Sequence, residues 1–327
     1  MTGAPGLAHA VRVHQTGDAS ALRFEAVDVG APGEGEALVR QTAVGLNFID
    51  VYHRTGLYPL PLPAVLGQEA AGVVEAVGPG VTLVAPGDRV AYAGVLGGYA
   101  DRRLVPADRL VQIPAGVTER DAAALMLKGM TARYLLRATT SVGPGHVVVV
   151  FAAAGGTGQI LVRWAKHLGA TVIANVGSEA KARVVERLGA DAVVVGTAGV
   201  CEAALDLTGG KGADVVYDSV GKDTFETSLA CLRVRGLLVS FGQSSGSPPP
   251  VPLSSLAKKC LYLTRPTLFA YTAARADLEE TAADLFAVVE RGVVAADIGQ
   301  TFALADAAGA HRALEARETV GATVLLP

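Results

Sequence analysis

A glycine-rich turn between two apolar segments is the part of this sequence best suited to bind a ligand. Residues 147–151 are four valines and a phenylalanine, a run typical of a strand buried on both faces. Residues 159–168 have the apolar spacing of a helix. The turn between them holds Gly155, Gly156, Thr157 and Gly158. Because glycines let a pyrophosphate approach a helix amino terminus, the pattern predicts a dinucleotide-binding turn. The spacing is A-x-x-G-G-x-G rather than G-x-G-x-x-G, so a purely structural turn is the alternative.

The next apolar segment indicates which dinucleotide would bind. Residues 171–176 form a second predicted strand, where an NAD-specific site would place an acidic residue for the ribose 2′-hydroxyl. This segment ends instead with the uncharged Asn175, followed by Gly177, Ser178 and Lys181. A hydroxyl donor and a cation favour a 2′-phosphate, and therefore NADPH over NADH. The alternative is that Ser178 only caps the next helix and that Lys181 is solvated.

Composition narrows the class of protein. Half of the 327 residues are apolar and 18% are charged, as in a globular chain of one to three domains. The net charge of −3 gives no attraction to nucleic acid or to an anionic membrane. No apolar run reaches the ~18 residues that span a bilayer, and residues 1–20 lack an apolar signal core. We therefore expect a cytoplasmic protein whose cysteines are reduced and mostly buried thiols. They are Cys201, Cys231 and Cys260.

Short strands dominate the first third of the chain. Apolar or alternating runs are separated by Gly, Pro and Asp turn signals, a density that suggests a small barrel or sandwich. These runs cover residues 11–14, 22–29, 37–44, 70–77, 89–93 and 99–105. A long helical pattern then follows over residues 121–138.

From residue 147 the pattern alternates between strands and helices, which predicts an α/β fold with a doubly wound parallel sheet. Further helices are predicted at 277–291 and 305–317, and a last strand at 322–326 that returns to the first, β-rich domain. The predicted parallel strands are 147–151, 171–176, 191–195, 214–218, 237–241 and a segment near 260–264.

Eight short motifs in order identify a resemblance over nearly the whole chain. They are GLNFID at 45–50, RTGLY at 54–58, EAAG at 69–72, PGDRV at 86–90, KGMTA at 128–132, AAAGGTG at 152–158, VYDSVG at 216–221 and SFG at 240–242. With these motifs the chain resembles the quinone oxidoreductases (ζ-crystallin type) of the medium-chain dehydrogenase/reductase superfamily, and especially the bacterial NADPH:quinone reductases.

This resemblance implies an architecture. It implies a catalytic, alcohol-dehydrogenase-like (GroES-like) barrel domain over residues 1–125 and 268–327, and an NADPH-binding Rossmann domain over 126–267. It also implies an active site in the cleft between them and a homodimer joined through residues 240–266.

The zinc-binding alcohol dehydrogenases of the same superfamily bind a catalytic zinc through cysteine and histidine. Here Asn47 and Gln68 stand at those positions, and no cysteine precedes Cys201. Amides are poor zinc ligands beside thiolate and imidazole, so we expect no metal. A quinone or a conjugated carbonyl compound is electron-poor enough to accept a hydride without a Lewis acid, and its oxyanion can take a proton from water. We therefore expect reduction of small quinones, with reduction of an enone or 2-alkenal as the alternative.

The resemblance also assigns residues to the site. Asn47 and Tyr52 are the catalytic candidates beside the nicotinamide, although a turn residue and a half-buried aromatic are the alternatives. Lys128 and Thr131, spaced i and i+3 on one helix, could face the same way, although Lys128 could instead extend to water. His53 is expected to be a surface neighbour. The remaining candidates for contact with the cofactor are Phe48, Ser219, Phe241, Gly242, Gln243, Ser244, Arg265, Pro266, Thr267 and Arg317.

Two departures and one rival function accompany this interpretation. Gly196 stands where the relatives have a tyrosine beside the 2′-phosphate, and Gln68 differs from the usual small or imidazole residue. The first weakens the expected preference for NADPH, and the second changes the pocket. Some ζ-crystallins are NADPH-binding structural proteins or bind AU-rich RNA, but an acidic chain without a basic, aromatic-laced stretch argues against RNA.

Overall fold

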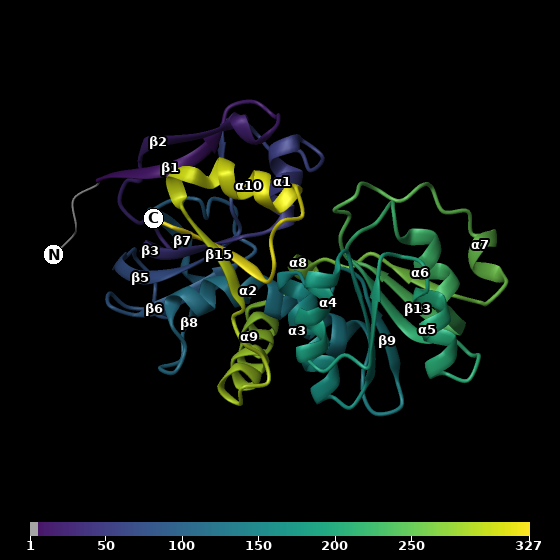
Figure 1. Ribbon diagram of the computed structural model, residues 1–327. Coiled ribbons are helices and arrows are strands. Elements are labelled where there is room, and N and C mark those ends of the chain that lie inside the picture. Colours follow the sequence, from purple (N-terminus) through teal and green to yellow (C-terminus); the bar gives the residue numbers. More distant parts are fainter. Residues whose placement is uncertain (1–5) are drawn as a thin grey trace. The chain divides into compact units, whose positions relative to one another are not determined.

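The computed structural model describes residues 6–327, which form a mixed α/β fold of two compact units (Figure 1). The first, called here the β-rich unit, comprises the described part of Met1–Met130 together with Thr272–Glu290 and Ala295–Pro327. The second, called the parallel-sheet unit, comprises Thr131–Tyr271 and Arg291–Val294. The first five residues, which open the predicted 1–125 segment, lie outside the described part of the chain.

The parallel-sheet unit contains the predicted doubly wound sheet. Its strand order is β11-β10-β9-β12-β13-β14, and every neighbouring pair is parallel. The order runs outward from β9 in both directions, so the chain switches direction at the carboxyl ends of β9 and β12, where ligands bind in such sheets. The strands are β9 (Val147–Val150), β10 (Thr171–Val176), β11 (Ala192–Val195), β12 (Ala213–Asp218), β13 (Leu232–Ser240) and β14 (Tyr262–Thr264).

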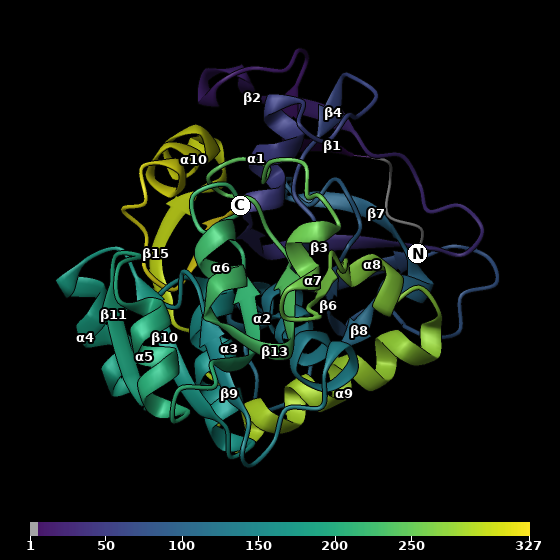
Figure 2. The same ribbon diagram turned by 90° about the vertical axis from the view of Figure 1, so that its right-hand side faces the viewer.

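Helices cover both faces of this sheet because its central strands are apolar on both sides. Val148, Val149 and Val150 are 0% exposed. Figure 1 shows α3 and α4 on one side and α5 and α6 on the other, and in Figure 2 α4 and the terminal strand β11 lie at one edge. The helices are α3 (Gly156–His167), α4 (Glu179–Arg187), α5 (Val200–Leu207), α6 (Phe225–Cys231), α7 (Ser254–Ala257) and α8 (Leu268–Tyr271).

Two elements of this part of the chain differ from the predicted bounds. Helix α2 (Glu119–Tyr134) gives way to a π-helical turn at Leu135–Thr139, rather than continuing as an α-helix to residue 138. The carbonyl of Leu135 accepts hydrogen bonds from the hydroxyls of Tyr217 (3.0 Å) and Thr140 (3.1 Å), which hold it outside the regular helical pattern. Strand β13 begins at Leu232, five residues before the predicted 237, because a register shift lets it continue along β12.

The β-rich unit is built from both ends of the chain. One sheet has the order β2-β1-β4, and a seven-stranded sheet has the order β15-β16-β3-β5-β6-β8 with β7 also paired to β3. The predicted last strand is β16 (Ala322–Leu326), and it pairs antiparallel with β3, as expected for a chain that returns to its first domain. The other strands are β1 (Leu7–Val13), β2 (Leu22–Asp28), β3 (Glu36–Leu46), β4 (Ala64–Val65), β5 (Glu69–Val77), β6 (Arg89–Ala93), β7 (Arg102–Pro106), β8 (Val111–Gln112) and β15 (Ile298–Ala303).

Strand β15 was not predicted from the sequence. Its residues alternate between half-buried and exposed, and Gly299, Gln300 and Thr301 interrupt any apolar run. Its pairing with β16 supplies what its composition lacks. Figure 1 shows this strand and α10, coloured yellow, lying against purple and blue elements from the start of the chain.

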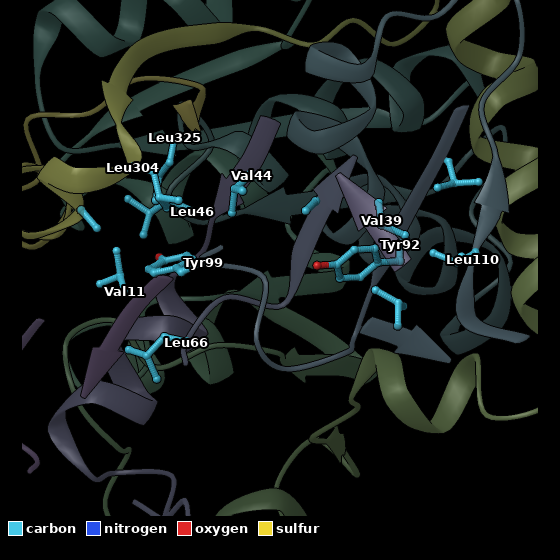
Figure 3. Packing of buried hydrophobic residues seen from close by; sticks show 14 of the residues in the cluster. Val11, Val39, Val44, Leu46, Leu66, Tyr92, Tyr99, Leu110, Leu304 and Leu325 are labelled. Atoms are coloured by element: carbon cyan, nitrogen blue, oxygen red, sulfur yellow. The ribbon is translucent and has the colours of Figure 1, made fainter. Parts of the chain in front are cut away.

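A hydrophobic cluster fills the β-rich unit, and close packing in it joins distant segments (Figure 3). Tyr92 and Tyr99 are 0% exposed and lie among aliphatic side chains from β1, β3 and the carboxyl-terminal segment. Over the described residues of this unit, four helices and three short 3-10 turns complete it. The helices are α1 (Phe48–Thr55), most of α2, α9 (Arg275–Glu290) and α10 (Ala307–Glu315), and the turns are Ala19–Ala21, Ala107–Arg109 and Leu304–Asp306. Throughout residues 6–327, each helix is too short or too polar to span a bilayer.

Candidate functional site

The glycine turn has the shape required of a phosphate-binding loop. Strand β9 leads through it to α3, which begins at Gly156 with Gly155 as its N-cap. A Cβ on Gly158 would lie 2.4 Å from the carbonyl oxygen of Ala152, so only glycine allows α3 to pack this closely on the turn. Since the first amides of a helix have no partner within it, this end of α3 suits an anion.

The end of β10 presents the residues predicted to distinguish NADPH from NADH. Ser178 is the N-cap of α4 and accepts a hydrogen bond from the amide of Lys181 at 3.4 Å, so the capping role is real. A cap uses the hydroxyl oxygen as acceptor and leaves its proton available to a ligand. A Cβ at Gly177, or at Gly196 on the neighbouring strand end, would have no atom within 4 Å. The space there fits a bulky group.

The side-chain amide nitrogen of Asn175 forms hydrogen bonds within the protein. Its amide nitrogen donates to the carbonyls of Gly196 (2.5 Å) and Val194 (3.3 Å), which ties the end of β10 to the end of β11. Asn175 therefore brings no negative charge to this strand end, and it fixes the position of Gly196.

Several other predicted residues meet at the carboxyl ends of β12 and β13. The amide of Ser244 donates to the carbonyl of Ser219 at 3.2 Å, and a Cβ on Gly242 would lie 2.6 Å from that same oxygen. Arg265 donates to the carbonyl of Ser240 at 3.1 Å. Phe241 is partly exposed between them, and Gln243 is buried and accepts a hydrogen bond from Ser247.

Three further predicted contacts, Pro266, Thr267 and Arg317, lie in two different units. Pro266 is buried and Thr267 is exposed, both directly after Arg265 in the parallel-sheet unit. Arg317 belongs to the β-rich unit, where it follows α10 and is exposed with a φ of +60°.

In the β-rich unit, a buried carboxylate that the sequence analysis did not assign joins two of the predicted residues. Glu69 is 0% exposed. Its Oε2 accepts hydrogen bonds from Asn47 Nδ2 (2.8 Å) and Lys128 Nζ (2.7 Å), and its Oε1 accepts from the amide of Leu127 (2.6 Å). Asn47 is the N-cap of α1, and Lys128 lies on α2. Glu69 therefore fixes two site candidates from different helices.

This geometry decides the alternatives left open for Lys128. The side chain is 6% exposed and forms an ion pair with Glu69, so it does not extend to water. Thr131, three residues along α2, is also buried, at 8% exposure. The carboxylate of Glu69 lies close to the backbone of β3. A Cβ on Gly45 would lie 2.2 Å from Glu69 Oε2, which explains why a glycine stands at position 45.

A second buried network lies beneath α1. Arg54 donates to Nδ1 of His311 (3.2 Å), so His311 carries its proton on Nε2 and donates it to the hydroxyl of Tyr99 (3.0 Å). Tyr99 donates to Oδ2 of Asp50 (3.0 Å), which also accepts from the amide of Asn47 (2.9 Å). Arg54 binds Glu315 of α10 through both terminal nitrogens. The chain of donors thus runs from the last helix to the first turn of α1.

Burial perturbs the titration of this network. It raises the pKa of the Asp50 carboxyl to about 7, against smaller effects of the hydrogen bonds from Asn47 and Tyr99. Burial, together with the charge of Arg54, lowers the pKa of His311 to about 3, which keeps this imidazole neutral. Oδ1 of Asp50 has no hydrogen-bond partner in the described part of the chain. Asp50 is therefore the group here that can change charge near neutral pH.

His53 is not the surface neighbour that the sequence suggested. It is half-buried, its Nδ1 lies 3.2 Å from the carbonyl of Tyr58, and its Nε2 lies 2.8 Å from Nε2 of Gln68. The carbonyl of Tyr58 requires a proton on Nδ1, so Nε2 accepts from Gln68. Burial lowers the pKa of His53, against a smaller effect of the Tyr58 carbonyl. Within residues 6–327, Oε1 of Gln68 is left without a hydrogen-bond partner.

The aromatic candidates pack along α1. Tyr52 is buried at 7% exposure, and its ring lies 5.5 Å from Phe48 and 5.2 Å from Tyr58, centroid to centroid. The predicted residues Asn47, Phe48 and Tyr52 thus share one short helix that begins directly after β3. In residues 6–327, no three His, Cys, Asp or Glu side chains are grouped to hold a metal ion.

Comparison with known proteins matches both parts of the chain. Residues 33–115 match the alcohol dehydrogenase GroES-like domain, and residues 156–288 match a family described as zinc-binding dehydrogenase. The chain is 49% identical to a quinone oxidoreductase of Pseudomonas aeruginosa over 95% of this chain and 97% of that protein. It is 45% identical to a 2-haloacrylate reductase of a Burkholderia species, over 96% and 98% of the two chains.

Solved structures give the same result. The structure of Escherichia coli quinone oxidoreductase complexed with NADPH is similar to this chain with a TM-score of 0.94 and 43% identity, covering 98% of this chain and all of that one. A mycobacterial protein complexed with NADPH has a TM-score of 0.95 and 44% identity over the same shares.

The buried ion pair predicts a specific pattern of stability. Glu69→Gln should lower the free energy of unfolding by about 3–5 kcal/mol, because Lys128 is left as a buried charge. Lys128→Met should also destabilise the protein, and the double variant should cost clearly less than the sum of the two. Urea unfolding followed by circular dichroism measures all four proteins. Additive losses would show that the two side chains do not depend on each other.

Asp50 predicts a pH dependence. Its folded-state pKa of about 7 lies above the usual unfolded value, so the folded state holds a proton that the unfolded state has released between about pH 4 and pH 7. Stability is therefore lost as the pH rises through this range. In Asp50→Asn this loss should vanish. The unfolding free energy of the wild type minus that of the variant should fall by up to about 1.4 kcal/mol per pH unit from pH 5 to 7 and then level off. A difference that is constant with pH would contradict the assignment.

Proposed function

Because the chain belongs to the quinone oxidoreductase family of the medium-chain dehydrogenase/reductase superfamily, we propose that it reduces small quinones with NADPH. The observation that carries this proposal is the match over nearly the full length to quinone oxidoreductases at 43–49% identity. The glycine turn before α3 and the open space at the end of β10 support the proposal, because they suit the phosphate groups of NADPH.

The residues present fit NADPH. The first turn of α3 would hold the pyrophosphate, and Ser178 and Lys181, beside the open space at Gly177, would hold the 2′-phosphate. The ends of β12 and β13 would line the cofactor beyond the pyrophosphate, and Asn47, Tyr52 and Thr131 would contact the nicotinamide. When bound, NADPH supplies the hydride. The remaining proposed contacts are Phe48, Lys128, Ser219, Phe241, Gly242, Gln243, Ser244, Arg265, Pro266, Thr267 and Arg317.

The protein contributes orientation rather than acid catalysis in this proposal. Glu69 holds the carboxamide of Asn47 and neutralises Lys128, so both side chains keep one arrangement without reorganising. Tyr52 offers a ring already packed between Phe48 and Tyr58. His53 is neutral and engaged on both ring nitrogens, so water protonates the reduced acceptor.

The proposal includes independence from zinc. Asn47 and Gln68 occupy the positions where the metal-dependent members have thiolate and imidazole, and both amides donate to other side chains, Glu69 and His53.

We also propose a homodimer formed through residues 240–266. Strand β14 ends the sheet on that side, and Tyr262 and Leu253 are 61% and 84% exposed. An exposed edge strand with large apolar side chains suits pairing with a second copy. A cytoplasmic location is proposed with it, in keeping with a sequence that has only three widely spaced cysteines and therefore no disulfide framework.

One finding favours a second activity. The chain is 45% identical over nearly its whole length to a 2-haloacrylate reductase, whose named substrate is an activated alkene. The same hydride donor and the same oriented residues would serve an acceptor in which a carbonyl or carboxyl group withdraws electrons from a C=C bond. Reduction of conjugated alkenes is therefore the alternative.

Loss of NADPH absorbance with several acceptors tests the function. The purified protein should oxidise NADPH with 1,4-benzoquinone and 9,10-phenanthrenequinone, faster than with NADH and equally with or without EDTA. Turnover only on 2-hexenal or 2-chloroacrylate, with the saturated product identified, would move the assignment to alkene reduction. Tight NADPH binding without turnover of any acceptor would reject both and leave a binding protein.

Lys181 carries a prediction about cofactor preference. Lys181→Ala should raise the KM for NADPH at least about tenfold, equivalent to about 1.4 kcal/mol, because a cation beside the 2′-phosphate is lost. The KM for NADH and the kcat should change little. Lys211→Ala is the matched control, since Lys211 is exposed just before β12, at the opposite end of the parallel strands. Equal losses for NADPH and NADH would show that Lys181 does not read the phosphate.

A further inference from the structure

Two cysteines of the parallel-sheet unit bring their thiols together. Cys201 lies in the first turn of α5 and Cys231 is the last residue of α6. Their sulfur atoms are 2.8 Å apart, although the residues are 30 positions apart in the sequence. A disulfide bond is about 2.05 Å long, so the sulfurs need to approach by only a fraction of an ångström. The third cysteine, Cys260, is exposed, in contrast to the expectation of mostly buried thiols.

The two thiols differ in a way that assigns them different roles. Cys201 is partly exposed and can meet a small oxidant, whereas Cys231 is 2% exposed. Burial, together with the hydrogen bond to Cys201, raises the pKa of Cys231, against a smaller opposing effect of the charge of Lys259. Cys201 is therefore the thiol that meets the oxidant, and Cys231 is the thiol that completes the bond.

A cation stands beside the buried thiol. Nζ of Lys259 donates to the carbonyls of Ala230 and Leu232, each at 2.7 Å, on either side of Cys231. A positive charge held there favours the thiolate form at the moment of attack. The neighbourhood is otherwise a hydrophobic cluster of α5, α6 and the sheet, which holds the two helices in place.

We propose that Cys201 and Cys231 form a redox-active pair, a modification site at which a peroxide converts two thiols into one disulfide. The thiolate of Cys201 attacks the peroxide, the O–O bond breaks, and Cys201 becomes a sulfenic acid as water leaves. The sulfur of Cys231 then attacks that of Cys201, the S–O bond breaks, and hydroxide leaves and takes up the proton of Cys231 as a second water. In sum, two thiols and one hydrogen peroxide give one disulfide and two waters, and a dithiol reductant reverses the change.

The full-length protein with Cys260→Ser tests the pair without interference from the exposed thiol. After treatment with hydrogen peroxide and denaturation, neither of the two remaining cysteines should react with an alkylating reagent. The mass of the protein should be lower by two hydrogen atoms. Digestion should yield one disulfide-linked pair of peptides containing residues 201 and 231. Dithiothreitol should restore both thiols.

Matched controls separate the pair from general oxidation. With Cys201→Ser or Cys231→Ser added, the remaining thiol should gain oxygen or stay reactive, and no intramolecular link should form. The wild type, in which no core residue is altered, should fall from three reactive thiols to one. Retention of three thiols under these conditions, or links made mainly through Cys260, would overturn the proposal. None of these readouts depends on turnover of NADPH, so the proposed function and the pair can fail separately.

Discussion

A carboxylate that is wholly buried must be compensated, and the way Glu69 is compensated determines much of the β-rich unit. Its two oxygens accept hydrogen bonds from the side chains of Asn47 and Lys128 and from the backbone of Leu127. Each partner comes from a different position: the amino terminus of α1, the side chain face of α2 and the backbone of α2. Removing any of these partners leaves a charged or polar group buried without a hydrogen bond. Strand β5, which carries Glu69, and helices α1 and α2 therefore stabilise one another. Gly45 allows this approach by having no side chain of its own.

The second buried network, which runs from Arg54 to Asp50, adds a constraint of another kind, since it joins the two ends of the chain. Arg54 is 1% exposed and is bound by Glu315 and His311 of α10, more than 250 residues away. A buried guanidinium cannot lose its charge, so α10 has to lie against α1 for the unit to fold. This explains why the last strand and helix return to the first domain. The place of α10 beside α1 depends on the ion pair of the buried Arg54 with the more exposed Glu315, and the pairing of β16 with β3 reinforces it.

These two networks also mark the limit of what the sequence could show. The parallel sheet, the glycine turn and the helix cap at Ser178 were predictable because each is written in a few consecutive residues: apolar runs, glycines without Cβ atoms, and a hydroxyl before a helix. Glu69, Tyr99 and His311 were missed because no pattern in the residues next to them indicates that their side chains are buried and paired. Their partners lie far away in the sequence, and only the fold brings them within hydrogen-bond distance. Strand β15 was missed for the related reason that its partner, not its composition, makes it a strand.

The two units therefore hold their proposed site residues by different physical means. In the parallel-sheet unit, the first amides of α3 and the side chains of Ser178 and Lys181 are proposed to hold phosphates. The room for these phosphates depends on the absence of side chains at Gly158, Gly177 and Gly196. In the β-rich unit, the residues proposed to act near the nicotinamide are held by charges taken out of water. Such charges are costly unless every partner is in place, and this cost is what makes the orientation of Asn47 and Lys128 unique. A substrate that takes its proton from water requires no acid from the protein. In the proposed reaction, the protein has only to hold the hydride donor and the hydride acceptor in one orientation.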